Sequence, residues 1–188
     1  MTDLSKEEVR ALLFSRIDVI GVQHDLLDGF KVALIDIDIV AAYNRNSRFF
    51  RTVEYALFNS IVVLLYSLFE TRYNTVNLGA LISSLETPYN NKQIEEYRRR
   101  ITDLKPLIIK VAILRNQAVG HVTTARPPEE TLNRANLLYS DVESLIAATR
   151  QLFVDISNNE FGTDPGFRTD SNLAPVAVLA ALKTKFAL

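Results

Sequence analysis

The longest regular pattern in this sequence lies between Arg48 and Glu70, and its period is that of an α-helix. Residues at one face of such a helix recur every three or four positions, whereas a half-buried strand alternates apolar and polar residues. A broad apolar face of this kind must be covered by other elements. The pattern therefore predicts a central helix, and its apolar positions are Phe50, Val53, Leu57, Ile61, Leu64 and Leu68.

The N-terminal region predicts a second helix. Ser5 is followed three residues later by Glu8, which is a capping box: each side chain reaches a backbone N–H that the start of a helix leaves unpaired. Apolar residues continue at helical spacing as far as Phe30. Glycine weakens a helix, so we expect this helix to break near Gly29.

Two further stripes complete the predicted fold. One runs from Lys92 to Val119, with a kink expected at Pro106 because proline removes a helical hydrogen bond and clashes with the preceding turn. The other begins at Pro127 and continues to about Asn158, burying Leu138 on its apolar face. Together the stripes predict an all-α fold, an antiparallel up-and-down bundle of four to five main helices.

The remaining segments are less regular. Residues 32–40 fit either a helical stripe or an alternating strand, and we favour a helix because no second segment offers a strand partner. Ser47 is a candidate N-cap of the central helix. Residues 74–91 predict a connector with a short helix over 80–85, and residues 159–188 a loop followed by a short C-terminal helical tail.

Composition limits the chemistry that the chain can perform. Its 188 residues suit one domain spanning 1–188. The net charge of -1 argues against a binder of long duplexes, which normally carries a basic excess. There is no cysteine, and the two histidines are His24 and His121, so the sequence offers no credible zinc site, which needs three or four ligands. We expect neither a metal nor a cofactor.

The sequence also suggests a location. The first eight residues are polar and acidic, unlike the basic start and apolar run of a secretory signal. The most apolar stretch, Tyr55 to Phe69, is interrupted by polar residues and is shorter than the roughly 20 residues that span a bilayer. We therefore expect a cytoplasmic protein that does not enter the membrane.

The candidate site lies at the end of the helix predicted over 92–119. Arg115 takes the next position of its apolar stripe, Asn116 follows, and His121 comes directly after Gly120, a residue suited to ending a helix. In an antiparallel bundle this end lies beside the start of the central helix, which carries Glu54. We expect Arg115, His121 and Glu54 to form one cluster, together with the nearby Arg48 and Arg51.

Such a cluster can cleave RNA without a metal. An imidazole can take the proton from a ribose 2′-OH, while a guanidinium holds the phosphate and the charge that develops on it. Attack by that oxygen leaves a 2′,3′-cyclic phosphate. We assign proton transfer to His121, phosphate binding to Arg115 and orientation of either to Asn116, with Glu54 as an auxiliary. Arg48 and Arg51 are candidate RNA contacts.

Simpler interpretations stay open. Arg115 and His121 can cap helix carbonyls and pair with Glu54. His24 is expected to be a partly buried, hydrogen-bonded residue. The basic run over 97–100 adjoins acidic residues and is expected to be solvated charge.

The segment 115–121, which reads RNQAVGH, resembles the signature of the HEPN superfamily: an arginine, often followed by a polar residue, and a histidine after four to six residues. Its surroundings, together with residues 65–70 (LYSLFE) and 78–85, look most like the abortive-infection branch. The position two residues after the histidine, a modified tyrosine in another branch, is Thr123 here. The resemblance therefore does not imply adenylylation at this motif.

The resemblance implies a helical bundle that forms a homodimer and cuts RNA without metal, as part of a toxin-antitoxin or phage-defence system with an antitoxin partner. Members of the superfamily also exist that only bind RNA or partner proteins. The alternative function is therefore a non-catalytic helical module that binds RNA or a partner protein.

Overall fold

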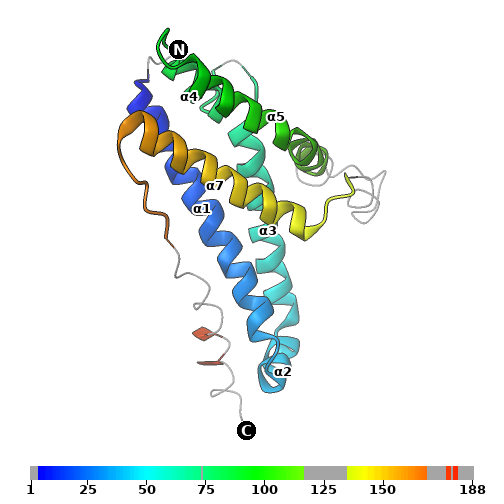
Figure 1. Cartoon of the computed structure of the whole chain (residues 1–188). Helices are drawn as coiled ribbons and strands as arrows, with labels where there is room; N and C mark the ends of the chain where they lie inside the picture. The colour runs from blue at the N-terminus through cyan, green and yellow to red at the C-terminus, as the bar shows by residue number, and fades with distance from the viewer. Residues whose placement is uncertain (1–3, 73, 117–134, 169–176, 179, 182–188) are drawn as a thin grey trace. The chain divides into compact units, whose positions relative to one another are not determined.

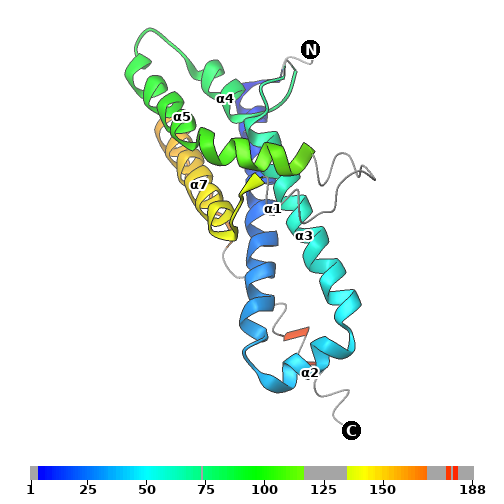
Figure 2. The same cartoon turned by 90° about the vertical axis from the view of Figure 1, so that its right-hand side faces the viewer.

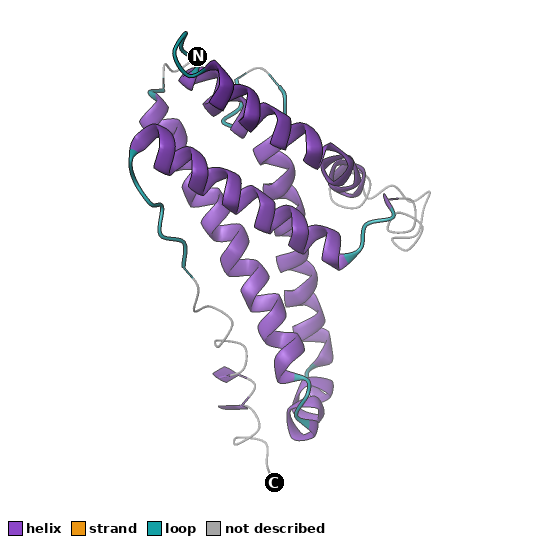
Figure 3. Ribbon diagram, viewed as in Figure 1, coloured by secondary structure: helices purple, strands orange, loops and turns teal. Residues whose placement is uncertain are grey.

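The computed structural model describes residues 4–72, 74–116, 135–168, 177–178 and 180–181. Within these ranges the chain is helical, with no strand (Figure 3). Four long helices, α1 (Lys6–Ala33), α3 (Ser47–Phe69), α5 (Asn91–Leu114) and α7 (Tyr139–Phe161), are accompanied by two short ones, α2 (Ile37–Arg45) and α4 (Leu78–Leu85) (Figure 1). The prediction of an all-α fold is confirmed.

Two compact units make up the chain. Unit 1 contains Met1–Ile17 and Val62–Gly166, and unit 2 contains Asp18–Ile61 and Phe167–Leu188. The helices α1 and α3 each continue from one unit into the other. That residues 1–188 form one domain stays a prediction.

Unit 1 is organised around α5, which packs against both α4 and α7. The buried side chains of α5 include Ile94, Tyr97 and Val111, all on the predicted stripe. Pro106 lies inside the helix, and α5 changes direction part-way along its length (Figure 2), as the expected kink requires. The short α4 begins at Asn77, whose side-chain oxygen accepts a hydrogen bond from the N–H of Ala80 at 2.8 Å.

Unit 2 has its own core. The second part of α1 and the first part of α3 lie side by side and are joined by α2 (Figure 2). Buried apolar side chains fill the space between them, and the ring of Phe50 contacts the rings of both Phe30 and Tyr43. The chain after α7 returns to α1, where the Arg168 guanidinium pairs with the buried carboxylate of Asp18.

The helix α1 differs from its prediction in one respect, near its C-terminal end. The capping box forms as expected, with the backbone N–H of Ser5 donating to the Glu8 carboxylate at 2.8 Å and the N–H of Glu8 donating to the Ser5 hydroxyl at 3.2 Å. The break near Gly29, however, was wrong, because α1 continues to Ala33. Burial of the neighbouring Leu27 and Phe30 outweighs the weak helix propensity of glycine.

Residues 32–40 are neither one helix nor a strand. The chain turns over residues 34–36, and α2 starts at Ile37. Of the apolar residues in this stretch, Ile39 is buried, whereas Ile35 is 83% exposed. Ser47, the candidate N-cap, is the first residue of α3 itself.

The helix predicted from Pro127 to Asn158 is interrupted. Asn136 has a positive φ of 44°, Leu138 is extended, and α7 begins only at Tyr139. Leu138 is 61% exposed, so its predicted burial was wrong: it takes the N-cap position instead of lying on the apolar face. The predicted start at residues 127–130 lies outside the described residues.

Among the described residues, α3 is the one helix that is long and apolar enough to cross a membrane. The core helices of soluble proteins meet the same criterion of length and composition.

Candidate active site

Arg115 lies where the last turn of α5 ends. Its backbone N–H donates to the carbonyls of Val111 and Ala112, and it follows Leu114, which is 2% exposed. Its side chain is only partly exposed. This is the position that the apolar stripe predicted, because Arg115 follows the buried Val111 by one helical turn.

Two neighbours hold the Arg115 side chain. The guanidinium carbon lies 5.0 Å from the centre of the Tyr66 ring on α3, a cation–π contact. One terminal nitrogen of Arg115 donates a hydrogen bond to the side-chain oxygen of Asn116 at 2.9 Å. The ring restricts the plane of the guanidinium and the amide restricts its rotation, so both contacts orient it.

These contacts leave most of the guanidinium available. An arginine carries five N–H donors in a planar fork, and the hydrogen bond to Asn116 uses one of them. Among the described residues, no carboxylate forms an ion pair with Arg115. Its remaining donors therefore suit a planar or tetrahedral anion such as a phosphate, which binds arginine through two parallel hydrogen bonds.

Glu54 has a different partner. It lies on α3 in unit 2, where its carboxylate accepts a hydrogen bond from the Tyr43 hydroxyl at 3.0 Å. Burial raises the pKa of Tyr43 above its ordinary value, and the hydrogen bond to Glu54 raises it further, while Arg51 acts in the opposite direction. Tyr43 thus stays a neutral donor to the Glu54 side chain, with the Arg51 guanidinium nearby.

The predicted site residues therefore fall into separate groups. Arg115 and Asn116 are together in unit 1, whereas Glu54, Arg48 and Arg51 are in unit 2. His121, with Gly120 and Thr123, lies outside the described residues. The cluster of Arg115, His121 and Glu54 stays a prediction.

The other basic residues singled out in the sequence have acidic partners. On α5, Arg98 pairs with Glu86 at 2.6 Å and Arg100 pairs with Asp155 at 2.6 Å. Arg99 contacts carboxylates one turn away on either side of it, in Glu96 and Asp103. Their charge is thus locally neutralised. Arg98 and Arg99 are exposed, as expected for solvated charge, whereas Arg100 is partly buried.

His24 lies within α1 and is partly buried, as expected. Its Nδ1 lies 3.6 Å from a carboxylate oxygen of Asp28, one turn further along the helix.

The fold and the Arg-Asn-x4-His segment describe a helical domain of the HEPN type. The sequence matches the AbiU2 family of HEPN domains (HEPN_AbiU2) over residues 39–172, and the chain belongs to that family. It is therefore a HEPN-like protein associated with abortive infection. The matched range contains α3, α4, α5, α7 and the whole of segment 115–121. No curated protein and no solved structure matches the chain.

Sequence reasoning missed the two tyrosines that contact the predicted site residues. Tyr66 lies within the segment 65–70 on which the family resemblance partly rests, but the sequence does not show that its ring faces Arg115. Tyr43 follows apolar residues on α2, so its ring could be expected to be buried. A buried tyrosine hydroxyl needs a hydrogen-bond partner, and this requirement could have indicated the contact with Glu54.

Proposed function

We propose that this protein is a metal-independent endoribonuclease of the HEPN type, acting as a homodimer in the cytoplasm within a toxin-antitoxin or phage-defence system. The observation that supports it best is the state of Arg115. This cation is half-buried and held by Tyr66 and Asn116, and among the described residues it has no carboxylate partner. A buried charge without a counter-ion is costly, which favours an anionic ligand.

The proposed reaction uses the chain's own side chains. Neutral His121 takes the proton from a ribose 2′-OH, and the oxygen attacks the adjacent phosphorus while Arg115 binds the phosphate oxygens. The bond from phosphorus to the 5′-oxygen breaks, and that oxygen takes up a proton. The products carry a 2′,3′-cyclic phosphate and a 5′-OH. Asn116 orients Arg115, Glu54 assists, and Arg48 and Arg51 contact the RNA chain.

The test is cleavage of a structured RNA by the purified protein in EDTA, with analysis of the product ends. We expect cyclic phosphate ends from the wild type, and a rate at least about 100-fold lower for His121→Ala, since general acid–base catalysis typically contributes that much or more. Arg99→Ala is a matched control, because this arginine is already paired with carboxylates. Absence of cleavage, or equal cleavage by His121→Ala, contradicts the proposal.

The same experiment separates the alternative function. A non-catalytic module binds RNA or a partner protein without cutting. If Arg115→Ala loses RNA affinity while no variant cleaves, the motif serves binding alone. Light scattering of the same preparations tests the homodimer, and co-expression with the product of the neighbouring gene tests the antitoxin partner.

A further inference from the structure

The start of α3 carries a basic and aromatic surface that includes Arg48 and Arg51, the two candidate RNA contacts. Two adjoining open hollows of about 460 and 470 Å³ lie along the α2–α3 junction, and both are lined by Ser47, Arg48 and Thr52. The remaining lining residues are Arg45, Asn46, Phe49, Arg51 and Tyr55. None of these described residues is acidic, and the sequence contains no Asp or Glu from residue 39 to residue 53.

Two aromatic rings on this surface face solvent. Phe49 is 64% exposed and Tyr55 is 57% exposed, although apolar side chains of this size are normally covered. Phe49 is nevertheless anchored, because its ring packs edge-on against the buried Phe50 with centroids 5.3 Å apart. Phe50 in turn stacks on Tyr43 at 5.2 Å. The exposed ring of Phe49 therefore packs on the core of unit 2 through Phe50, which in turn contacts Tyr43.

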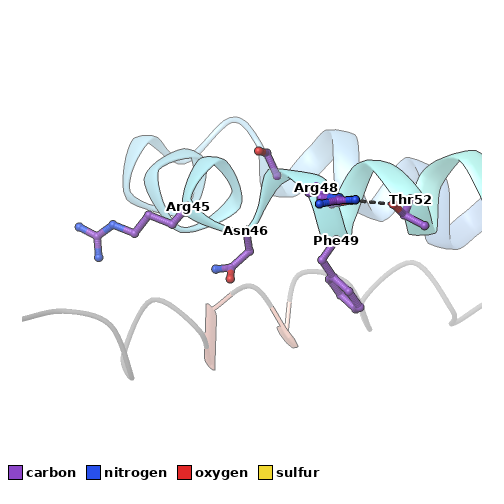
Figure 4. A pocket seen from close by; sticks show the side chains of 6 residues that line it. Arg45, Asn46, Arg48, Phe49 and Thr52 are labelled. Atoms are coloured by element: carbon purple, nitrogen blue, oxygen red, sulfur yellow. Dashed lines mark hydrogen bonds between the residues drawn. The ribbon is translucent and has the colours of Figure 1, made fainter.

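Polar side chains accompany these rings along the α2–α3 junction. Figure 4 shows the side chains of Asn46 and Phe49 extending to the same side of the chain, while the side chain of Arg45 extends away from them. Arg48, Thr52 and Tyr55 follow one another at helical spacing and so share a face of α3. Among the described residues, Arg48 makes no ion pair, in contrast to the arginines over 98–100 on α5.

Exposed rings flanked by arginines are the elements that bind single-stranded nucleic acids. Bases stack on the rings, arginines bind the phosphates, and short polar side chains hydrogen-bond the edges of unpaired bases. A paired base has no free face for such rings. We propose that the α2–α3 junction binds single-stranded RNA, with bases stacking on Phe49 and Tyr55 and phosphates bound by Arg45, Arg48 and Arg51. This inference rests on the proposed function, which supplies RNA as the ligand. It adds that the bound RNA must be single-stranded.

Binding is measured in the His121→Ala background with EDTA present, so that cleavage does not interfere. The probe is a fluorescein-labelled oligouridine of about ten nucleotides, compared with a blunt RNA duplex by fluorescence anisotropy. Phe49→Leu and Tyr55→Leu keep an apolar side chain but remove the π-face. Each should weaken oligouridine binding by at least about fivefold, since stacking on one ring contributes that much or more. Tyr55→Phe should bind as the parent does.

Charge is tested separately. Arg48→Gln should reduce the slope of log affinity against log salt concentration by about 0.7, the value for one phosphate contact on a single strand. Arg99→Gln removes the same charge from an arginine that already has acidic partners, and it should leave the slope unchanged. Circular dichroism of each variant checks its helical content.

Several results overturn the inference. Equal affinity for the duplex, an unchanged affinity in both leucine variants, or equal slopes for Arg48→Gln and Arg99→Gln each contradict it. Binding to anionic lipid vesicles without binding to oligouridine identifies a membrane surface instead. If RNA binds here but wild type never cuts it, the ribonuclease proposal fails and this one stands. If wild type cuts RNA while the leucine variants bind oligouridine normally, the ribonuclease proposal stands and the proposed binding at the α2–α3 junction fails.

Discussion

The guanidinium of Arg115 lies over the ring of Tyr66, with 5.0 Å between the guanidinium carbon and the ring centre. The two residues are on different helices, α5 and α3, and both belong to unit 1. This cation–π contact restricts the position of the guanidinium, whose five N–H donors remain more than the single hydrogen bond to Asn116 requires. Tyr66 therefore acts through Arg115, as a positioning residue for the proposed phosphate site.

The first prediction tests that role. Tyr66→Leu removes the ring and lets the guanidinium rotate, so the rate of RNA cleavage should fall about tenfold or more. Tyr66→Phe keeps the ring and should retain nearly the wild-type rate. Both rates are measured under single-turnover conditions beside the thermal unfolding of each variant. If Tyr66 has only a structural role, Tyr66→Leu should unfold at a lower temperature but should cleave RNA at the same rate as Tyr66→Phe.

The second prediction concerns the start of α7. The Asp141 carboxylate accepts hydrogen bonds from the Lys110 ammonium at 2.8 Å and from the Leu138 N–H at 3.0 Å, and these hold its pKa below the ordinary value. Because the folded-state pKa is lowered, this carboxylate stabilises the fold above about pH 4, the pKa of an unfolded aspartate. That contribution is lost as the pH falls through the lower, folded-state pKa.

Asp141→Asn should accordingly be less stable than wild type at pH 7, and the difference should shrink as the pH approaches 3 or so. Urea unfolding at a series of pH values measures it. Glu95→Gln, at an exposed position of α5, is the control and should show a small difference with little pH dependence. A difference between wild type and Asp141→Asn that stays constant with pH would show that the charge of Asp141 does not matter.

The third prediction concerns the end of α7. Gly162 has a positive φ of 64°, and its N–H donates to the Asn158 carbonyl at 3.1 Å. A Cβ added here would contact nothing within 4 Å, so only the backbone conformation opposes a side chain. Gly162→Ala should lower the free energy of unfolding by about 1 kcal/mol. Gly162→Asn should cost less, because asparagine adopts this conformation more readily; equal effects in urea unfolding would argue against this explanation.

Periodicity predicted the helices well where burial and helix propensity agree. The stripe beginning at Phe50 became α3, and the short helix over residues 80–85 became α4. The errors come from places where tertiary contacts decide. Gly29 stays helical because the neighbouring side chains are buried. Leu138 takes the N-cap position before the first residue of α7, so its side chain does not lie on the apolar face of that helix.

The site was predicted to a more limited extent. That Arg115 belongs to a half-buried stripe follows from its spacing to Val111, and the structure agrees. Its contact with Tyr66, however, depends on how two helices are rotated against each other, which no local pattern specifies. Phe49 lies off the stripe that begins at Phe50, and its exposure agrees with that spacing rather than with its residue type.

Asp18 and its partner Arg168 are 150 positions apart in the chain. A ribosome that adds about 5–20 residues each second makes Asp18 on the order of 10 s before Arg168. During that interval the first part of unit 2 has emerged without the segment that closes it, because the unit is assembled from Asp18–Ile61 and Phe167–Leu188. The completion of unit 2 thus follows the synthesis of unit 1, because the second segment of unit 2 comes after Gly166 in the chain.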